Sequence, residues 1–188
     1  MRRCGLYIFV FLFSVVRAFA SETPLLDKAE ALYQSKAYEQ AAEIFSNVLA
    51  GTEDADLRQQ CLLRLGDCIQ MGWLEGRGTS DTYYAQVLEQ GYSPYLLQAF
   101  RKWRASYQEA HHGKTNRGMA TFTENELYNR KKAEVLVRID NYLKDHPQDA
   151  VAIAQRESLR QLADIAPGGP FGSSVLDESA ELWPEFSE

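Results

Sequence analysis

The sequence lacks the short motifs by which catalytic and metal sites are usually identified. It contains no HExxH, no CxxC and no serine in a nucleophile-elbow motif. Of its three histidines, His111 and His112 are adjacent, so their side chains would diverge by about 100° on a helix and could not hold one metal ion together. We therefore expect no enzymatic activity, no metal and no other cofactor.

Long apolar runs are also scarce. The run at residues 6–16 has eleven residues, whereas a membrane span takes roughly 20. Arginines precede this run and Ala18-Phe19-Ala20 follows it, a pattern typical of a cleaved signal peptide over residues 1–20. We expect the mature chain to start at Ser21 without a membrane anchor. Arg17, between the run and the cleavage site, keeps an uncleaved anchor as the alternative.

Basic residues are outnumbered by acidic ones. The chain has 20 Lys and Arg against 26 Asp and Glu, a net charge of −6, and losing the three arginines of the signal peptide would bring it to −9. Such a chain is poorly suited to the phosphate backbone of nucleic acids. We therefore expect no nucleic-acid partner.

Cysteine is rare, and after export only Cys61 and Cys68 would remain. An even pair invites a disulfide in an oxidising compartment. Both residues, however, fall in a predicted helix over residues 56–71, where seven residues separate their Cα atoms by roughly 10 Å. A disulfide needs Cα atoms within about 7 Å. We expect two buried free thiols, and a disulfide only if the helix breaks.

Apolar residues recur at spacings of three and four in two adjacent segments, which predicts two amphipathic helices. Lys36 and Ala37 leave room only for a tight turn between them, so the two apolar faces would meet as a helical hairpin. These apolar positions are Leu25, Ala29 and Leu32 in the first segment and Tyr38, Ala41, Phe45 and Val48 in the second.

The order of large, small and aromatic residues in this hairpin resembles the tetratricopeptide repeat (TPR), a helical hairpin of about 34 residues. The pair Leu65-Gly66 matches the large-then-small pair at the corresponding place in a second unit. The resemblance implies an all-α, right-handed superhelix of three to four hairpins over residues 21–166. Residues 167–188 would then form a disordered, acidic tail.

Polar residues predict where the other helices start. Either Asp54 or Asp56 could cap the first helix of the second unit. Ser93-Pro94 is typical of a further helix start. Thr123 and Glu126 form a capping box that opens a long helix.

Two other segments complete the predicted domain. Residues 113–122 read as an inserted loop, which the family normally lacks. A last helix over residues 149–165 could supply the solvating end that solenoids require.

The positive charge gathers in one part of the chain. Residues 101–138 carry nine bases and four acids, whereas the tail carries five acids and no base. This basic set could bind an anionic partner or the tail, or it could simply be a solvated face. Its helical members are Arg101, Lys102, Arg104, Arg130, Lys131 and Lys132.

The tail contains large apolar residues that a disordered segment would ordinarily lack, namely Leu182, Trp183 and Phe186. They could dock on another protein or on this domain, or they could cover the last helix.

The resemblance also implies a partner-binding groove, lined by the first helix of each unit. The terminal-carboxylate clamp of some relatives is not matched, because Leu26 and Glu30 stand at the corresponding positions. The matching groove positions are Leu26, Asp27, Glu30 and Tyr33 in the first unit and Leu63, Arg64, Asp67, Gln70 and Met71 in the second.

Such repeats bind proteins or peptides. We therefore expect an exported adaptor or assembly factor of the bacterial periplasm or cell envelope, or a secreted protein. A structural envelope component that self-associates into homo-oligomers is the alternative. An enzyme using the basic cleft of residues 101–138 is the third choice.

Overall fold

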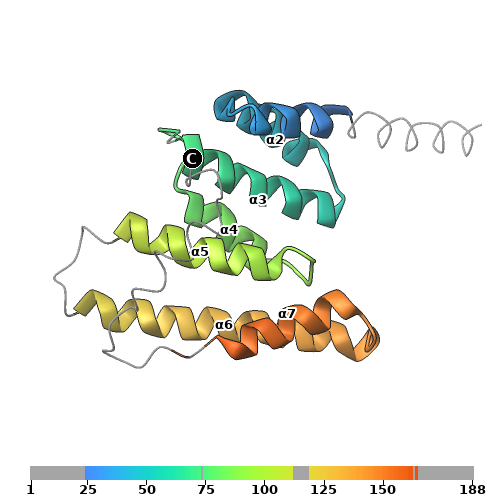
Figure 1. Ribbon diagram of the computed structural model, residues 1–188, viewed down its shortest axis with the longest axis vertical. Helices are drawn as coiled ribbons and strands as arrows, with labels where there is room; N and C mark the ends of the chain where they lie inside the picture. Colours follow the sequence, from blue (N-terminus) through green and yellow to red (C-terminus); the bar gives the residue numbers. More distant parts are fainter. Residues whose placement is uncertain (1–23, 73, 112–118, 163, 165–188) are drawn as a thin grey trace, which may run out of the picture. The chain divides into compact units, whose positions relative to one another are not determined.

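The computed structural model describes residues 24–72, 74–111, 119–162 and 164 (Figure 1). These residues form seven helices and no strand, which confirms the predicted all-α class. The chain divides into two compact units, one up to Arg77 and one from Gly78. Within the described helices, none is both long enough and apolar enough to cross a membrane. The predicted signal peptide and the tail after residue 167 lie outside the described residues.

The first unit begins with the predicted hairpin, formed by a helix over residues 24–34 and by α2 (Tyr38–Gly51). The backbone N–H groups of Lys36 and Ala37 donate to carbonyls in the last turn of the first helix, each at 2.9 Å. Lys36 has a φ of 63°, in the left-handed region that usually belongs to glycine. These features define a Schellman motif, and they confirm the tight turn.

The inward faces of this hairpin are mostly those expected. All four buried residues of α2, Ala41, Ala42, Phe45 and Val48, are small or apolar. On the first helix, Ala29 and Tyr33 are buried, but Leu25 is 45% exposed. The prediction for Leu25 was therefore wrong. A helix turns by about 100° per residue, and the helix presents Leu26, half-buried, on the inner side in its place.

The third helix of this unit, α3 (Ala55–Gly72), starts at one of the two predicted caps. The Asp54 carboxylate accepts hydrogen bonds from the backbone N–H groups of Asp56 and Leu57, at 2.9 and 3.0 Å. Asp54 is therefore the N-cap, and Asp56 lies inside the first turn.

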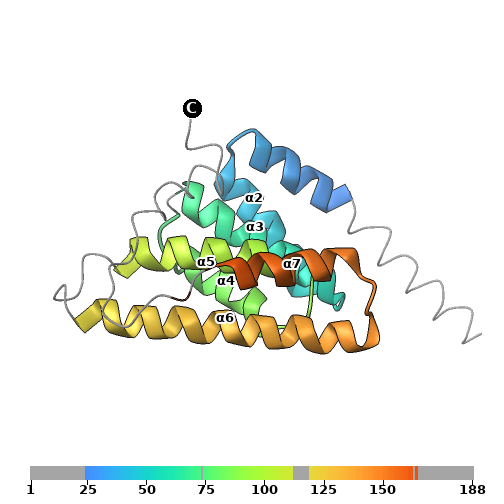
Figure 2. The same cartoon turned by 60° about the horizontal axis from the view of Figure 1, so that its bottom comes forward.

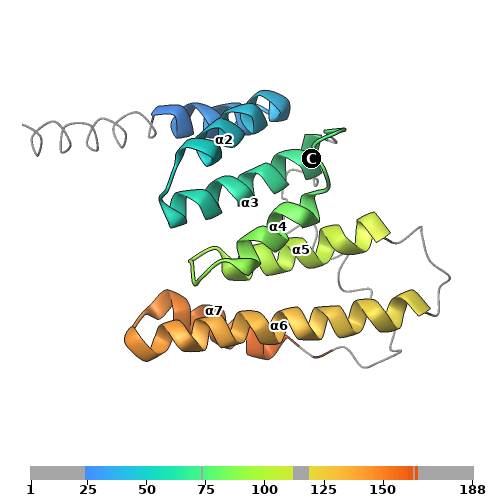
Figure 3. The same cartoon turned by 180° about the vertical axis from the view of Figure 1, so that it is seen from behind.

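The second unit contains two helix pairs, α4 (Ser80–Glu89) with α5 (Leu96–His111) and α6 (Met119–Asp145) with α7 (Ala150–Gln161). Helices α6 and α7 run side by side in opposite directions (Figures 1 and 3). Helix α7 also contacts α5, so the second pair packs on the first.

The core of the second unit is aromatic where α5 meets α6. The rings of Phe100 and Tyr128 lie 5.3 Å apart, and Phe100 lies 6.1 Å from Trp103. Aromatic pairs at such distances stabilise beyond the area they bury. The buried apolar residues are Tyr84, Val87, Leu88, Leu96, Ala99, Phe100, Trp103, Tyr128, Val135, Ile139, Leu143, Ala152 and Leu159.

Three predicted helix boundaries in this unit were wrong by two to four residues. Helix α6 begins at Met119, so Thr123 is inside the helix and its capping box does not open it. Residues 119–122 of the predicted loop therefore belong to α6. Helix α5 begins at Leu96, two residues after the predicted start, and α7 ends at Gln161.

Candidate partner-binding site

Four of the nine predicted groove residues come together in the first unit. The Arg64 guanidinium donates to Glu30 at 2.8 Å and pairs with Asp67 at 3.4 Å. It also lies over the ring of Tyr33, 4.9 Å from the ring centre. Glu30 and Tyr33 belong to the helix over residues 24–34, and Arg64 and Asp67 belong to α3. This polar cluster therefore ties the first helix to the third.

The spacing of the cluster is regular. Glu30 and Arg64 are 34 residues apart, and so are Tyr33 and Asp67. Equivalent positions of consecutive repeats face each other when hairpins stack with this period. The sequence could have indicated the pairing through the opposite charges of Glu30 and Arg64 at one repeat length.

The burial of these side chains determines what the cluster can do. The Asp67 side chain is fully buried, whereas Arg64 is 28% exposed and Glu30 is 27% exposed. Burial by itself lowers the pKa of Arg64, but the hydrogen bond to Glu30 and the nearby carboxylate charges outweigh it, so the pKa is raised. Arg64 therefore stays protonated and charged, and it neither donates nor accepts a proton in a reaction near neutral pH.

The nine predicted groove residues do not form one exposed surface. Burial divides them into three groups. The buried residues are Tyr33, Leu63, Asp67 and Gln70. The half-buried residues are Leu26, Glu30, Arg64 and Met71, and the exposed residue is Asp27. A partner could reach the half-buried and exposed members, while the buried ones belong to the packing of the unit.

Cys61 and Cys68 are structural. They are buried and form no disulfide in an unbroken α3, as predicted. Burial raises the pKa of Cys68 to about 12, and the charge of Asp67 adds to this rise. The thiolate that thiol chemistry requires is therefore suppressed.

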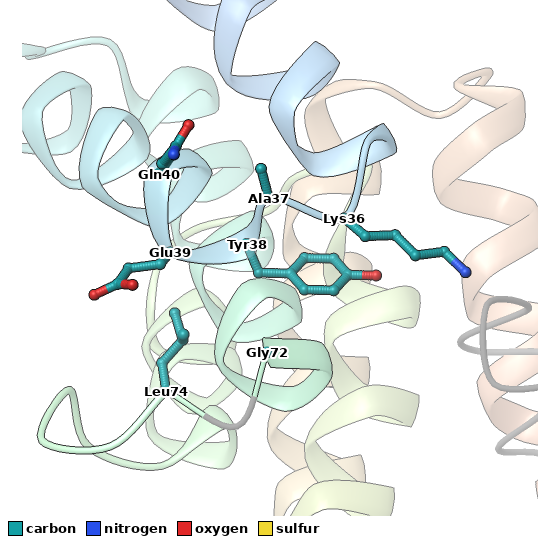
Figure 4. Close-up of a pocket in the computed structure, with 7 residues that line it drawn as sticks. All are labelled: Lys36, Ala37, Tyr38, Glu39, Gln40, Gly72 and Leu74. Atoms are coloured by element: carbon teal, nitrogen blue, oxygen red, sulfur yellow. The ribbon is translucent and has the colours of Figure 1, made fainter.

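Beside the first hairpin turn lies a shallow depression of about 340 Å³, which sequence reasoning missed. It forms where the N-terminus of α2 meets the C-terminus of α3 (Figure 4). A Cβ at Gly72 would lie 2.8 Å from the Cβ of Tyr38, so the two helices approach closely there. The residues lining it are Lys36, Ala37, Tyr38, Glu39, Gln40, Gly72 and Leu74.

Most side chains of the predicted basic set are at least half-buried, and several make contacts within the second unit. Lys131 pairs with Glu89 at 3.4 Å and with Glu134 at 3.8 Å. Arg104 lies over the ring of Tyr128, 4.7 Å from its centre. By burial the set divides into Lys102, Arg104 and Lys132, which are buried, Arg101 and Lys131, which are half-buried, and Arg130, which is exposed.

A ring stack at the end of α6 was also missed. Tyr142 stacks on Tyr92 at 3.8 Å and on His146 at 4.2 Å. Its hydroxyl donates to Asp149 at 3.0 Å, and Asp149 also accepts from the N–H groups of Val151 and Ala152 as the N-cap of α7. The bond from Ala152 and then that from Tyr142 lower the pKa of Asp149. Burial, followed by the charge of Asp149, raises the pKa of Tyr92 to about 12.

The polar cluster and the ring stack show that polar contacts, as well as apolar packing, join the helices of each unit. Across the described ranges, no three His, Cys, Asp or Glu side chains are grouped as a metal site would require. The chain matches no protein-family model, and comparisons with the curated proteins and with the solved structures find no match.

Proposed function

We propose that this chain is an exported protein-binding module, built from TPR-like hairpins that form a right-handed superhelix. In this proposal it acts as an adaptor or assembly factor in the bacterial periplasm or cell envelope. Its ligand is a protein or peptide that contacts the first helices of the hairpins.

One observation carries the proposal. The ion pair between Glu30 and Arg64 joins the helix over residues 24–34 to α3 across 34 residues, the length of a TPR unit. Repeat proteins of this kind use their stacked helices as binding surfaces. The exposed part of the cluster, together with Asp27, would lie on that surface.

The proposal is tested by site-specific photo-crosslinking in a bacterial host. A photoreactive residue replaces Asp27 in one version of the full chain and Val137 in a control version. Val137 is 58% exposed on α6 and lies outside the proposed groove. We expect an adduct with a second protein from position 27 that position 137 does not give, and its loss when Glu30→Gln is added.

Other outcomes would change the conclusion. Adducts between two copies of this chain from position 27 would favour the self-associating envelope component. Identical adducts from both positions, or none from position 27, would contradict the proposed groove.

A further inference from the structure

The last helix of the second unit is held by little apolar surface. Only three of the twelve residues of α7 are buried, namely Ala152, Gln155 and Leu159, and one of these is polar. Val151, also on α7, is 52% exposed. Since apolar burial is the main attractive force between helices, α7 is weakly attached compared with α6, which buries Tyr128, Val135, Ile139 and Leu143.

The buried Gln155 weakens this attachment further. Its side-chain amide N–H donates to the carbonyl of Pro94 at 2.6 Å, just before α5. Its side-chain oxygen is buried and has no hydrogen-bond partner among the described residues. An unsatisfied buried acceptor costs free energy that a released α7 would recover from water.

Polar contacts to α6 hold α7 in place. The Lys132 ammonium donates to the carbonyl of Leu162, where α7 ends, and pairs with Asp164 at 2.7 Å. A cation at this position is favourable because helix C-termini carry partial negative charge. Arg156 and Arg160 pair with Asp140 at 3.7 and 3.6 Å.

Helix α7 lies alongside both α5 and α6 (Figure 2). We propose that α7 is a releasable strap: it opens as one unit while α5 and α6 stay folded, and it uncovers the surface that Ala152, Gln155 and Leu159 now cover. The occupant that fits this surface is an amphipathic helix of a partner protein, with apolar residues at the spacing of Ala152, Gln155 and Leu159. This proposal rests on the protein-binding function proposed above and adds a second binding surface to it. The opening of α7 itself does not depend on the groove of the first unit.

Hydrogen exchange of the full chain tests the opening. We expect the amides of α7 to exchange at one common rate, about tenfold or more faster than the buried amides of α5 and α6. Lys132→Met should speed α7 exchange about tenfold, because the contacts of the Lys132 ammonium with Leu162 and Asp164 are lost. Gln155→Leu should slow it by less than tenfold, since it removes the unsatisfied oxygen but also the hydrogen bond to Pro94. Lys131→Met is the matched control, because the partners of Lys131 are Glu89 and Glu134.

A peptide of residues 148–162 carrying Gln155→Leu then tests the surface. It should bind the full chain by displacing α7, more tightly when the chain carries Lys132→Met and more weakly when the chain carries Gln155→Leu. Exchange of α7 at the rate of α5 and α6 would overturn the proposal. So would a gradient of rates rising toward Gln161, which indicates fraying, or failure of the peptide to bind the Lys132→Met chain. None of these results would affect the crosslinking at position 27.

Discussion

Replacing Arg64 with methionine tests the polar cluster most directly. The substitution keeps an unbranched side chain but removes the guanidinium that contacts Glu30 at 2.8 Å and Asp67 at 3.4 Å. The Asp67 carboxylate, which is fully buried, would then lose this cation. The ring of Tyr33 would lose its cation–π contact as well.

The expected cost follows from the burial of the two acids. Removing one partner of a fully buried ion pair costs about 3–5 kcal/mol. Because the Arg64 side chain is 28% exposed, we expect Arg64→Met to lower the free energy of unfolding by about 2–3 kcal/mol. Glu30 is also partly exposed, so Glu30→Gln should cost only about 0.5–1 kcal/mol.

Urea denaturation followed by circular dichroism measures these values, and hydrogen exchange in α3 assigns the loss to the first unit. Lys28→Met is the control: Lys28 is exposed on the same first helix as Glu30, and we expect a change within about 0.5 kcal/mol. Adding Asp67→Asn to Arg64→Met should recover part of the loss, since a neutral amide is cheaper to bury than a carboxylate that has lost its cation.

Two results would refute this reasoning. If Arg64→Met were no more destabilising than Lys28→Met, the cluster would contribute nothing to the joining of the first helix and α3. If Glu30→Gln cost more than Arg64→Met, the buried Asp67 would not be the acid that depends on the guanidinium.

Four further predictions concern the first unit. Gly72→Ala should destabilise by about 1–3 kcal/mol, because its Cβ would meet that of Tyr38 at 2.8 Å, whereas Gly51→Ala, with open space around it, should be neutral or stabilising in the same urea titration. Lys36→Gly should stabilise by about 0.5–1 kcal/mol, because glycine adopts a positive φ without strain; a lower melting temperature would contradict this. With its pKa raised to about 12, Cys68 should react with a disulfide reagent at pH 8 about a thousandfold more slowly in the folded chain than after denaturation. The same shift should make stability fall as pH rises from about 8.5 toward 12, because only the unfolded chain then loses the proton.

The features that the sequence predicted well are local. The turn at Lys36 and Ala37, the apolar face of α2 and the cap at Asp54 follow from spacings and side-chain chemistry within a few residues. A local signal also gave a wrong prediction. The capping box at Thr123 has the right residues, but α6 begins four residues before it, and the residues of the box alone do not determine where the helix begins.

The sequence alone determined the all-α class, the first hairpin and the position of Cys61 and Cys68 on one continuous helix, because helical periodicity and rise are properties of the local chain. The tertiary structure decided which charged side chains meet. It paired Lys131 with Glu89 across 42 residues and buried Lys132 against the end of α7. These pairings depend on how each helix is rotated about its axis when it packs. A shift of one residue turns a side chain by about 100°, so net charge along the sequence cannot distinguish an open basic surface from cations that pair inside the fold.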